Sequence, residues 1–185
     1  MFWTKEASSP TITWKAENTG NCRATGVQQG RAQITVPCTG GSLHDYVPLY
    51  FAFKTPMVSC NRLSNDKMIF QRGSLNILAT PGVVFTDGNA RSYNTHFFLY
   101  GGIDSLGVLS VKSIQTAKYA GDEKVKRQKQ SEILIPDFLE FSQVLDIFVY
   151  SEEARKTVVA ELLRRDIRVS VTKAWNWYYP KAGKA

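Results

Sequence analysis

The sequence predicts an α+β fold with a strand-rich core, and three features of its hydropathy pattern support this class. Val47–Phe53 and Val144–Tyr150 are apolar on both faces, which is typical of strands buried inside a sheet. Residues 167–172 alternate between apolar and polar side chains, as a half-buried strand does. Residues 151–165 carry apolar side chains at helical spacing. Because strands and helices do not alternate regularly, the pattern argues against a doubly wound parallel sheet.

Further strands are expected between the two buried ones. Ser74–Ala79 and Val83–Phe85 are short apolar runs, and the turn residues 80–82 separate them. Residues 131–135 form another apolar run, which Pro136 ends. The pattern therefore predicts at least six strands in one domain.

Two helical regions are expected in the second half of the chain. Residues 111–130 predict a helix that a loop interrupts around Gly121. Ser151 is expected to cap the next helix, because its hydroxyl can accept a free N–H group of the first turn. Glu152 and Glu153 then favour the positive end of the helix dipole. The aromatic residues 175–179 are expected to pack as a terminus rather than to stack on DNA bases.

The composition limits the class of protein. The chain has 185 residues, the size of one domain with a buried core, and 23 Lys and Arg against 16 Asp and Glu give a net charge of +7. This excess permits a nucleic-acid partner without establishing one. No apolar run reaches the roughly 18 residues of a membrane span, and the start lacks a signal-peptide pattern.

The cysteines and histidines bear on location and on metal binding. Cys22, Cys38 and Cys60 lack a CxxC spacing and indicate reduced thiols of a cytoplasmic protein. With only His44 and His96 available, a zinc site of standard spacing is excluded, and no metal is expected.

The motifs of common nucleotide-binding and hydrolytic enzymes are absent from the sequence, so individual carboxylates carry more information. Glu132 lies in an apolar strand, where a carboxylate is costly to bury without a partner. Gln130 would project from the same face, since side chains two residues apart on a strand share a face. Two interpretations stay open: an exposed edge-strand or structural ion-pair residue, or a carboxylate that stabilises positive charge in a cleft.

A basic stretch precedes Glu132. Six Lys and Arg lie between residues 112 and 129, against only Asp122 and Glu123. Such a stretch is commonly a solvated surface, but it can also follow nucleic-acid phosphates beside an active site. Its position next to Glu132 favours the second interpretation.

Several motifs, in the same order along the chain, resemble those of the DarT family of DNA ADP-ribosyltransferases. The resemblance extends from about Arg31 to Tyr179. Its strongest motif is Gly40–Phe51, and the QAE-like catalytic segment at Gln130–Leu134 has Ser131 where alanine is usual. The other matching segments are Thr55–Met57, Val84–Asp87, Tyr150–Glu153 and Trp177–Tyr179.

The resemblance implies an ADP-ribosyltransferase-like fold, a mixed pair of packed sheets with flanking helices. It implies an enzyme that cleaves NAD, its co-substrate, at the nicotinamide–ribose bond and transfers ADP-ribose to a thymine base in single-stranded DNA. It also implies a toxin that is held in check by a DarG-like antitoxin, whose macrodomain removes the modification.

Site roles follow from the same resemblance. Glu132 would bind the ribose 2′-hydroxyl and stabilise an oxocarbenium-like ribose. Arg31 would stabilise charge and position the substrate, because its high pKa makes it a poor proton acceptor. The resemblance places Tyr50, Phe51, Thr55, Met57 and Gln130 around NAD, and it places Lys126, Arg127 and Lys129 against DNA phosphates.

The chain departs from the family pattern at its start. Family members open with a histidine-bearing strand and a helix, whereas no histidine precedes His44 here. We therefore expect an irregular segment over residues 1–30 and an ADP-ribosyltransferase domain over residues 31–185. Two alternatives stay open: a catalytically defective relative that binds nucleic acid without transfer, and a transferase with a protein or RNA acceptor.

Overall fold

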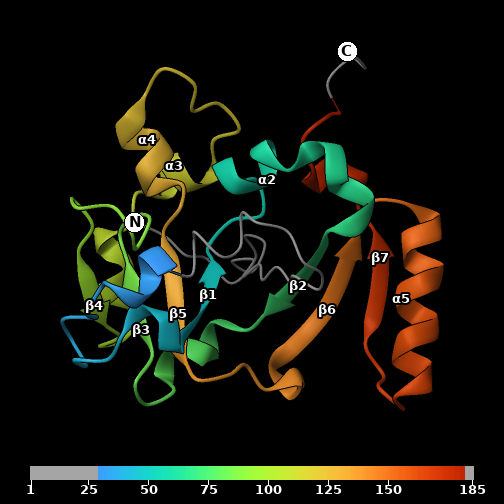
Figure 1. Ribbon diagram of the computed structural model, residues 1–185, viewed down its shortest axis with the longest axis horizontal. Coiled ribbons are helices and arrows are strands. Elements are labelled where there is room, and N and C mark those ends of the chain that lie inside the picture. The colour runs from blue at the N-terminus through green and yellow to red at the C-terminus, as the bar shows by residue number, and fades with distance from the viewer. Residues whose placement is uncertain (1–28, 182–185) are drawn as a thin grey trace.

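Two β-sheets stand side by side in the computed structural model of the chain, which describes residues 29–181 (Figure 1). The strand order is β1-β5-β3-β4 in the first sheet and β2-β6-β7 in the second. Of the irregular segment expected over residues 1–30, residues 1–28 lie outside the described residues. Within the described part of the chain, no helix is both long and apolar enough to cross a membrane.

The first sheet is antiparallel throughout and holds β5 at its centre. Its strands are β1 (Tyr46–Tyr50), β3 (Val84–Thr86), β4 (Phe97–Leu99) and β5 (Glu132–Pro136). Ile133 and Ile135 of β5 pack in one buried cluster, whereas Leu134 packs in another. Because successive strand residues point to opposite faces, both faces of this sheet are covered. The first four residues of β5 are all buried, as its continuous apolar run predicts.

The second sheet combines an antiparallel and a parallel pair. Its strands are β2 (Ile69–Gly73), β6 (Val144–Val149) and β7 (Ser170–Lys173), with β2 antiparallel and β7 parallel to β6. Helix α5 (Glu152–Arg164) connects β6 to β7 and covers one side of this sheet (Figure 1). Ser151 caps α5 as expected, since its Oγ accepts from the Ala154 N–H at 3.2 Å.

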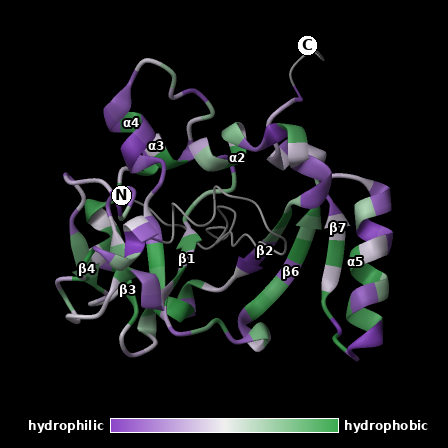
Figure 2. Cartoon of the chain, viewed as in Figure 1, coloured by the Kyte–Doolittle hydropathy of each residue, from purple (hydrophilic) through white to green (hydrophobic). Residues whose placement is uncertain are grey.

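Three short helices lie along one edge of the two sheets (Figure 1). They are α2 (Pro56–Cys60), α3 (Val111–Gln115) and α4 (Glu123–Gln128). The break between α3 and α4 contains Gly121 at φ 82°, so the interrupted helix expected there is confirmed. Figure 2 shows α4 as hydrophilic, in contrast to the hydrophobic strands inside both sheets. Short 3₁₀ helices fill the remaining connections at Leu43–Asp45, Arg62–Lys67, Leu75–Ala79, Ile103–Val108, Phe141–Gln143 and Trp175–Trp177.

Trp177, Tyr178 and Tyr179 pack against the second sheet as expected, whereas Trp175 is 67% exposed, so the expectation for Trp175 is wrong. The Trp177 ring stacks on Phe53 with 4.5 Å between centroids. The buried Tyr178 hydroxyl donates to the carbonyl oxygens of Met68 (3.0 Å) and Phe148 (3.1 Å). This cluster joins the loop before α2 to β2 and β6.

Three expectations about the strands need correction. The predicted strand Ser74–Ala79 is wrong, because Ser74 caps a 3₁₀ helix there through its Oγ and the buried Ile77 and Leu78 fill the core beneath the first sheet. Strand β2 was not predicted, since its centre holds the polar pair Gln71–Arg72; Arg72 forms an ion pair with Asp146 on β6. Strand β7 begins only at Ser170, three residues after the predicted start at Ile167.

Candidate functional site

Glu132 is the first residue of β5, and β5 lies between β1 and β3 in the first sheet (Figure 1). Only 2% of its surface is exposed, so the edge-strand interpretation is wrong. Tyr50 is its register partner on β1, and directly opposed residues share one face of a sheet. Two polar side chains therefore meet on this face of the first sheet.

Two groups contact the Glu132 carboxylate. Arg31 Nη1 lies 3.4 Å from Oε2, and the Ala90 N–H donates to Oε1 at 3.0 Å. Burial raises the pKa of Glu132 above its usual value, and this outweighs the opposite effects of Arg31 and of the Ala90 N–H. The ion pair confirms the interpretation of Glu132 as a residue of a structural ion pair.

Arg31 connects this carboxylate to the backbone at the start of β1. It lies in a helical turn over residues 29–32 and is 6% exposed. Its Nη2 donates to the carbonyl oxygens of Leu43 (2.9 Å) and Tyr46 (3.2 Å), while Nη1 faces Glu132. The guanidinium is thus held by the backbone on one edge and by the carboxylate on the other.

Of the residues predicted around NAD, Tyr50 and Met57 lie near Glu132, whereas Phe51 and Thr55 are buried elsewhere. Tyr50 shares the face of Glu132, and its hydroxyl lies 4.0 Å from the Met57 sulfur. Burial, and after it the Glu132 carboxylate, raise the pKa of Tyr50, so this phenol stays protonated. Phe51, one residue beyond β1, packs instead in the buried cluster of Leu49 and Ile133, on the face opposite to Glu132. Thr55 is buried, and its Oγ1 accepts from the Val58 N–H as the cap of α2.

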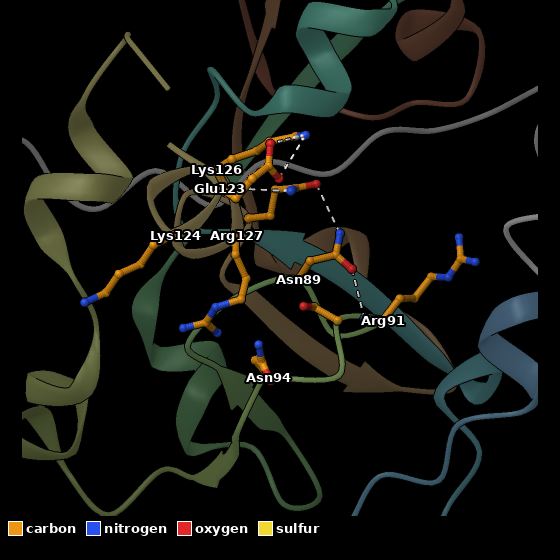
Figure 3. A pocket seen from close by; sticks show the side chains of 9 residues that line it. Asn89, Arg91, Asn94, Glu123, Lys124, Lys126 and Arg127 are labelled. Carbon is orange, nitrogen blue, oxygen red and sulfur yellow. Dashed lines mark hydrogen bonds and ion pairs between the residues drawn. The ribbon is translucent and has the colours of Figure 1, made fainter. Parts of the chain in front are cut away.

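Gln130 lines a polar pocket of about 670 Å³. Its Oε1 accepts from Asn89 Nδ2 at 3.1 Å, and its Nε2 donates to the Lys126 carbonyl at 3.1 Å. One wall of the pocket is α4 and the other is the loop between β3 and β4 (Figure 3). Its nine lining residues are Asn89, Arg91, Ser92, Asn94, Glu123, Lys124, Lys126, Arg127 and Gln130.

The three cations predicted against DNA occupy different environments. Lys126 lines the pocket and pairs with Glu123 at 3.1 Å. Arg127 lines it too, but its guanidinium pairs with Asp87 at 2.9 Å. Lys129 is only 1% exposed and donates to the carbonyl oxygens of Ile114 and Thr116. Since a buried ammonium cannot reach a phosphate, the expectation for Lys129 needs correction. Burial lowers the pKa of Lys129 to about 8.

Sequence reasoning missed the loop between β3 and β4. Ala90 supplies a backbone N–H, which leaves no trace in a side-chain pattern. Arg91 is exposed and lines the pocket, and Tyr93 is 97% exposed at the same loop. An exposed aromatic residue flanked by Arg91 and Asn94 was the available signal. Within residues 29–181, no group of three or more His, Cys, Asp or Glu is placed to hold a metal ion.

Comparison with known proteins identifies relatives of this arrangement. A sequence profile described as "ssDNA thymidine ADP-ribosyltransferase, DarT" matches residues 11–179. A DNA ADP-ribosyl transferase of Escherichia coli O127:H6 (strain E2348/69 / EPEC) is 31% identical over 176 residues, which cover 88% of this chain and 78% of that protein.

Two solved structures share the fold. Thermus sp. 2.9 DarT in complex with ADP-ribosylated ssDNA superposes with a TM-score of 0.77 at 26% identity, covering 84% of this chain and 79% of that one. The same Thermus protein in complex with NAD+ gives a TM-score of 0.79 at 22% identity, covering 94% and 99%. The predicted ADP-ribosyltransferase-like fold is therefore confirmed.

Proposed function

Because the chain belongs to the DarT family of ssDNA thymidine ADP-ribosyltransferases and is an NAD-dependent DNA ADP-ribosyltransferase, we propose that Glu132 is its catalytic carboxylate and that the adjoining polar pocket receives the DNA strand. The observation that carries this proposal is the position of Glu132, which is buried beside a guanidinium and follows two residues after Gln130, a residue that lines the basic pocket.

The chemistry of the donor set suits the cleavage of NAD. When the nicotinamide–ribose bond breaks, nicotinamide leaves with the bonding electron pair and the ribose becomes an oxocarbenium-like cation. The Glu132 carboxylate provides the negative charge that stabilises this cation, and it can also accept a hydrogen bond from a ribose hydroxyl. A thymine atom then donates an electron pair to the ribose carbon, and the base loses a proton.

Arg31 supports this step through charge. Its guanidinium favours the ionised form of Glu132, which burial alone disfavours. A guanidinium stays protonated in proteins, so Arg31 stabilises charge rather than accepting the thymine proton. Tyr50 and Met57, which contact each other beside Glu132, and Gln130 remain the proposed neighbours of NAD.

The DNA strand would follow the basic side of the pocket. Lys124 on α4 and Arg91 on the opposite loop are exposed, and in Figure 3 they extend to opposite sides. Such cations bind phosphates, while the exposed ring of Tyr93 offers a face on which a base can stack. Phosphate contacts position the strand without reading its sequence.

The test is intact-mass analysis of a mixed-sequence, thymine-rich single-stranded oligonucleotide after incubation with protein and NAD. Wild type should add one ADP-ribose mass, and Glu132→Gln should lower the rate on the order of 100-fold or more. Glu140→Gln is the matched control, because Glu140 is exposed and its side chain makes no cap hydrogen bond. Equal rates for wild type and Glu132→Gln would refute the catalytic role, and RNA or protein in place of DNA tests the other acceptors.

The partner and the location are further parts of the proposal. Family membership supports a DarG-like antitoxin, and a purified macrodomain of this kind should restore the oligonucleotide to its unmodified mass. Cys38 and Cys60 are free thiols, which supports a reducing, cytoplasmic environment.

A further inference from the structure

Arg127 of α4 lines the pocket, but its guanidinium forms its hydrogen bonds with the loop between β3 and β4. Its Nη1 and Nη2 donate to the two carboxylate oxygens of Asp87 at 2.9 and 3.4 Å. Nη1 also lies 3.3 Å from Thr95 Oγ1 at the far end of the loop. The side chains of Arg127 and Asp87 are only 19% and 16% exposed. In Figure 3, Arg127 reaches from α4 toward Asn94 on this loop.

The loop is shaped around the Arg127 side chain. A Cβ atom added at Gly88 would lie 2.4 Å from Arg127 Nη1 and 2.8 Å from its Cγ. Any larger residue would therefore displace the arginine, so glycine is required here for space. Burial alone would raise the pKa of Asp87, but the Arg127 guanidinium and the His96 backbone N–H hold it below its usual value. The ion pair is thus present at neutral pH.

The same loop supplies a hydrogen bond to the catalytic carboxylate. The Ala90 N–H, three residues after Asp87, donates to Glu132 Oε1 at 3.0 Å. Asn89 donates to Gln130 at 3.1 Å, just before β5. The loop therefore contacts the segment 127–132 through three side chains, those of Arg127, Gln130 and Glu132. The contacts with Gln130 and Glu132 lie at or next to the carboxylate.

On the basis of the proposed function, we propose that Arg127 is a positioning residue and not a DNA contact: its bidentate pair with Asp87 holds the β3–β4 loop so that the Ala90 N–H stays on Glu132. The Arg127 charge is neutralised within the protein, and a planar guanidinium suits this paired geometry better than an ammonium does. Lys124, exposed on the same helix, is the matched cation without this commitment to Asp87.

The first experiment measures the binding of a thymine-containing single-stranded oligonucleotide at several salt concentrations without NAD. A lost phosphate contact lowers the slope of log K against log salt by about 0.7 on single strands. Lys124→Ala should show this change and Arg127→Ala should keep the wild-type slope. A lower slope in Arg127→Ala would overturn the proposal.

The second experiment measures the transfer rate over a range of DNA concentrations at saturating NAD. Arg127→Ala, Arg127→Lys and Asp87→Asn should each lower kcat on the order of 10-fold and change the KM for DNA by less than kcat, because misplacing a supporting group acts mainly on the chemical step. If Arg127 instead bound phosphate, Arg127→Lys would keep activity, and Asp87→Asn would free a cation and lower the KM for DNA. Either result would contradict the positioning role.

Amide hydrogen exchange separates this inference from the proposed function, since it needs neither NAD nor DNA. Arg127→Ala should speed exchange in residues 88–96, and Lys124→Ala should not. Unchanged exchange in Arg127→Ala, together with an active wild type, would overturn the inference alone. Faster exchange in Arg127→Ala, together with an inactive wild type, would instead refute the proposed function. It would still support the role of the Arg127–Asp87 pair in holding the loop.

Discussion

Removing Arg31 should destabilise the fold by an amount that depends on pH. Arg31→Ala deletes the ion pair with Glu132 and the hydrogen bonds to the Leu43 and Tyr46 carbonyl oxygens. Glu132, 2% exposed, would keep only the Ala90 N–H. Breaking a buried ion pair by removing one partner costs about 3–5 kcal/mol, and we expect that loss at pH 8. As the pH falls from 8 toward 5, the lone carboxyl protonates more readily, and the cost falls toward that of the unpaired carbonyls, about 1–3 kcal/mol.

The sign of the pH dependence follows from proton binding. Without Arg31, the pKa of Glu132 in the folded state rises further above its unfolded value. Between those two values the folded state holds a proton that the unfolded state has released, so stability falls as pH rises. The wild type shows the same fall over a narrower range, because Arg31 opposes the effect of burial. The difference between wild type and Arg31→Ala therefore grows from pH 5 to pH 8.

The assay is urea unfolding followed by tryptophan fluorescence at pH 5 and pH 8. The variants are Arg31→Ala, Glu132→Gln and the double substitution. In the Glu132→Gln background, adding Arg31→Ala should cost the same at both pH values, because no carboxyl is left to titrate. An equal cost of the single Arg31→Ala change at pH 5 and pH 8 would refute the reasoning.

Two further predictions concern the buried lysine and the exposed tyrosine. Burial lowers the pKa of Lys129 from 10.5 to about 8, so between these values the unfolded state binds more protons. The free energy of unfolding of wild type, relative to that of Lys129→Met, should then rise with pH over that range by up to about 3 kcal/mol. Urea unfolding at pH 7.5, 9 and 10.5 measures this difference. A difference that does not change with pH would contradict the prediction. Tyr93 is 97% exposed and should stack on a base, so Tyr93→Ala should weaken single-stranded DNA binding about tenfold while Tyr93→Phe keeps the wild-type affinity. Fluorescence anisotropy measures the affinity of both variants. An equal loss of affinity in Tyr93→Ala and Tyr93→Phe would exclude stacking.

Local signals in the sequence predicted local structure well. The cap at Ser151 and the break around Gly121 depend on one turn of chain, and both are confirmed. The apolar run around Glu132 predicted a strand, and its central place in the sheet follows from pairing with β1 and β3. Short apolar runs are more ambiguous: Ser74–Ala79 became a 3₁₀ helix because a serine cap and two core contacts outweigh strand propensity.

The site was less accessible to sequence reasoning, because its contacts join distant segments. Arg31 and Glu132 are 101 residues apart, and only a family resemblance brought them together. Tyr50 and Phe51 were expected to act together, but adjacent strand residues face opposite sides, so only Tyr50 shares the face of Glu132. The resemblance placed Lys129 with Lys126 against DNA phosphates, whereas the end of α4 turns the Lys129 side chain into the protein.

The arrangement around Glu132 explains why a basic pocket and a buried carboxylate can occur in the same site. A carboxylate exposed among those cations would be screened by water and by their mobile charges. Burial instead leaves Glu132 with two fixed partners, Arg31 and the Ala90 N–H, in a medium where electrostatic interactions are stronger. The cost is a raised pKa and a fold that depends on both partners. Changes in the β3–β4 loop, which lines the pocket and donates the Ala90 N–H to the carboxylate, should therefore affect transfer even where they leave DNA binding intact.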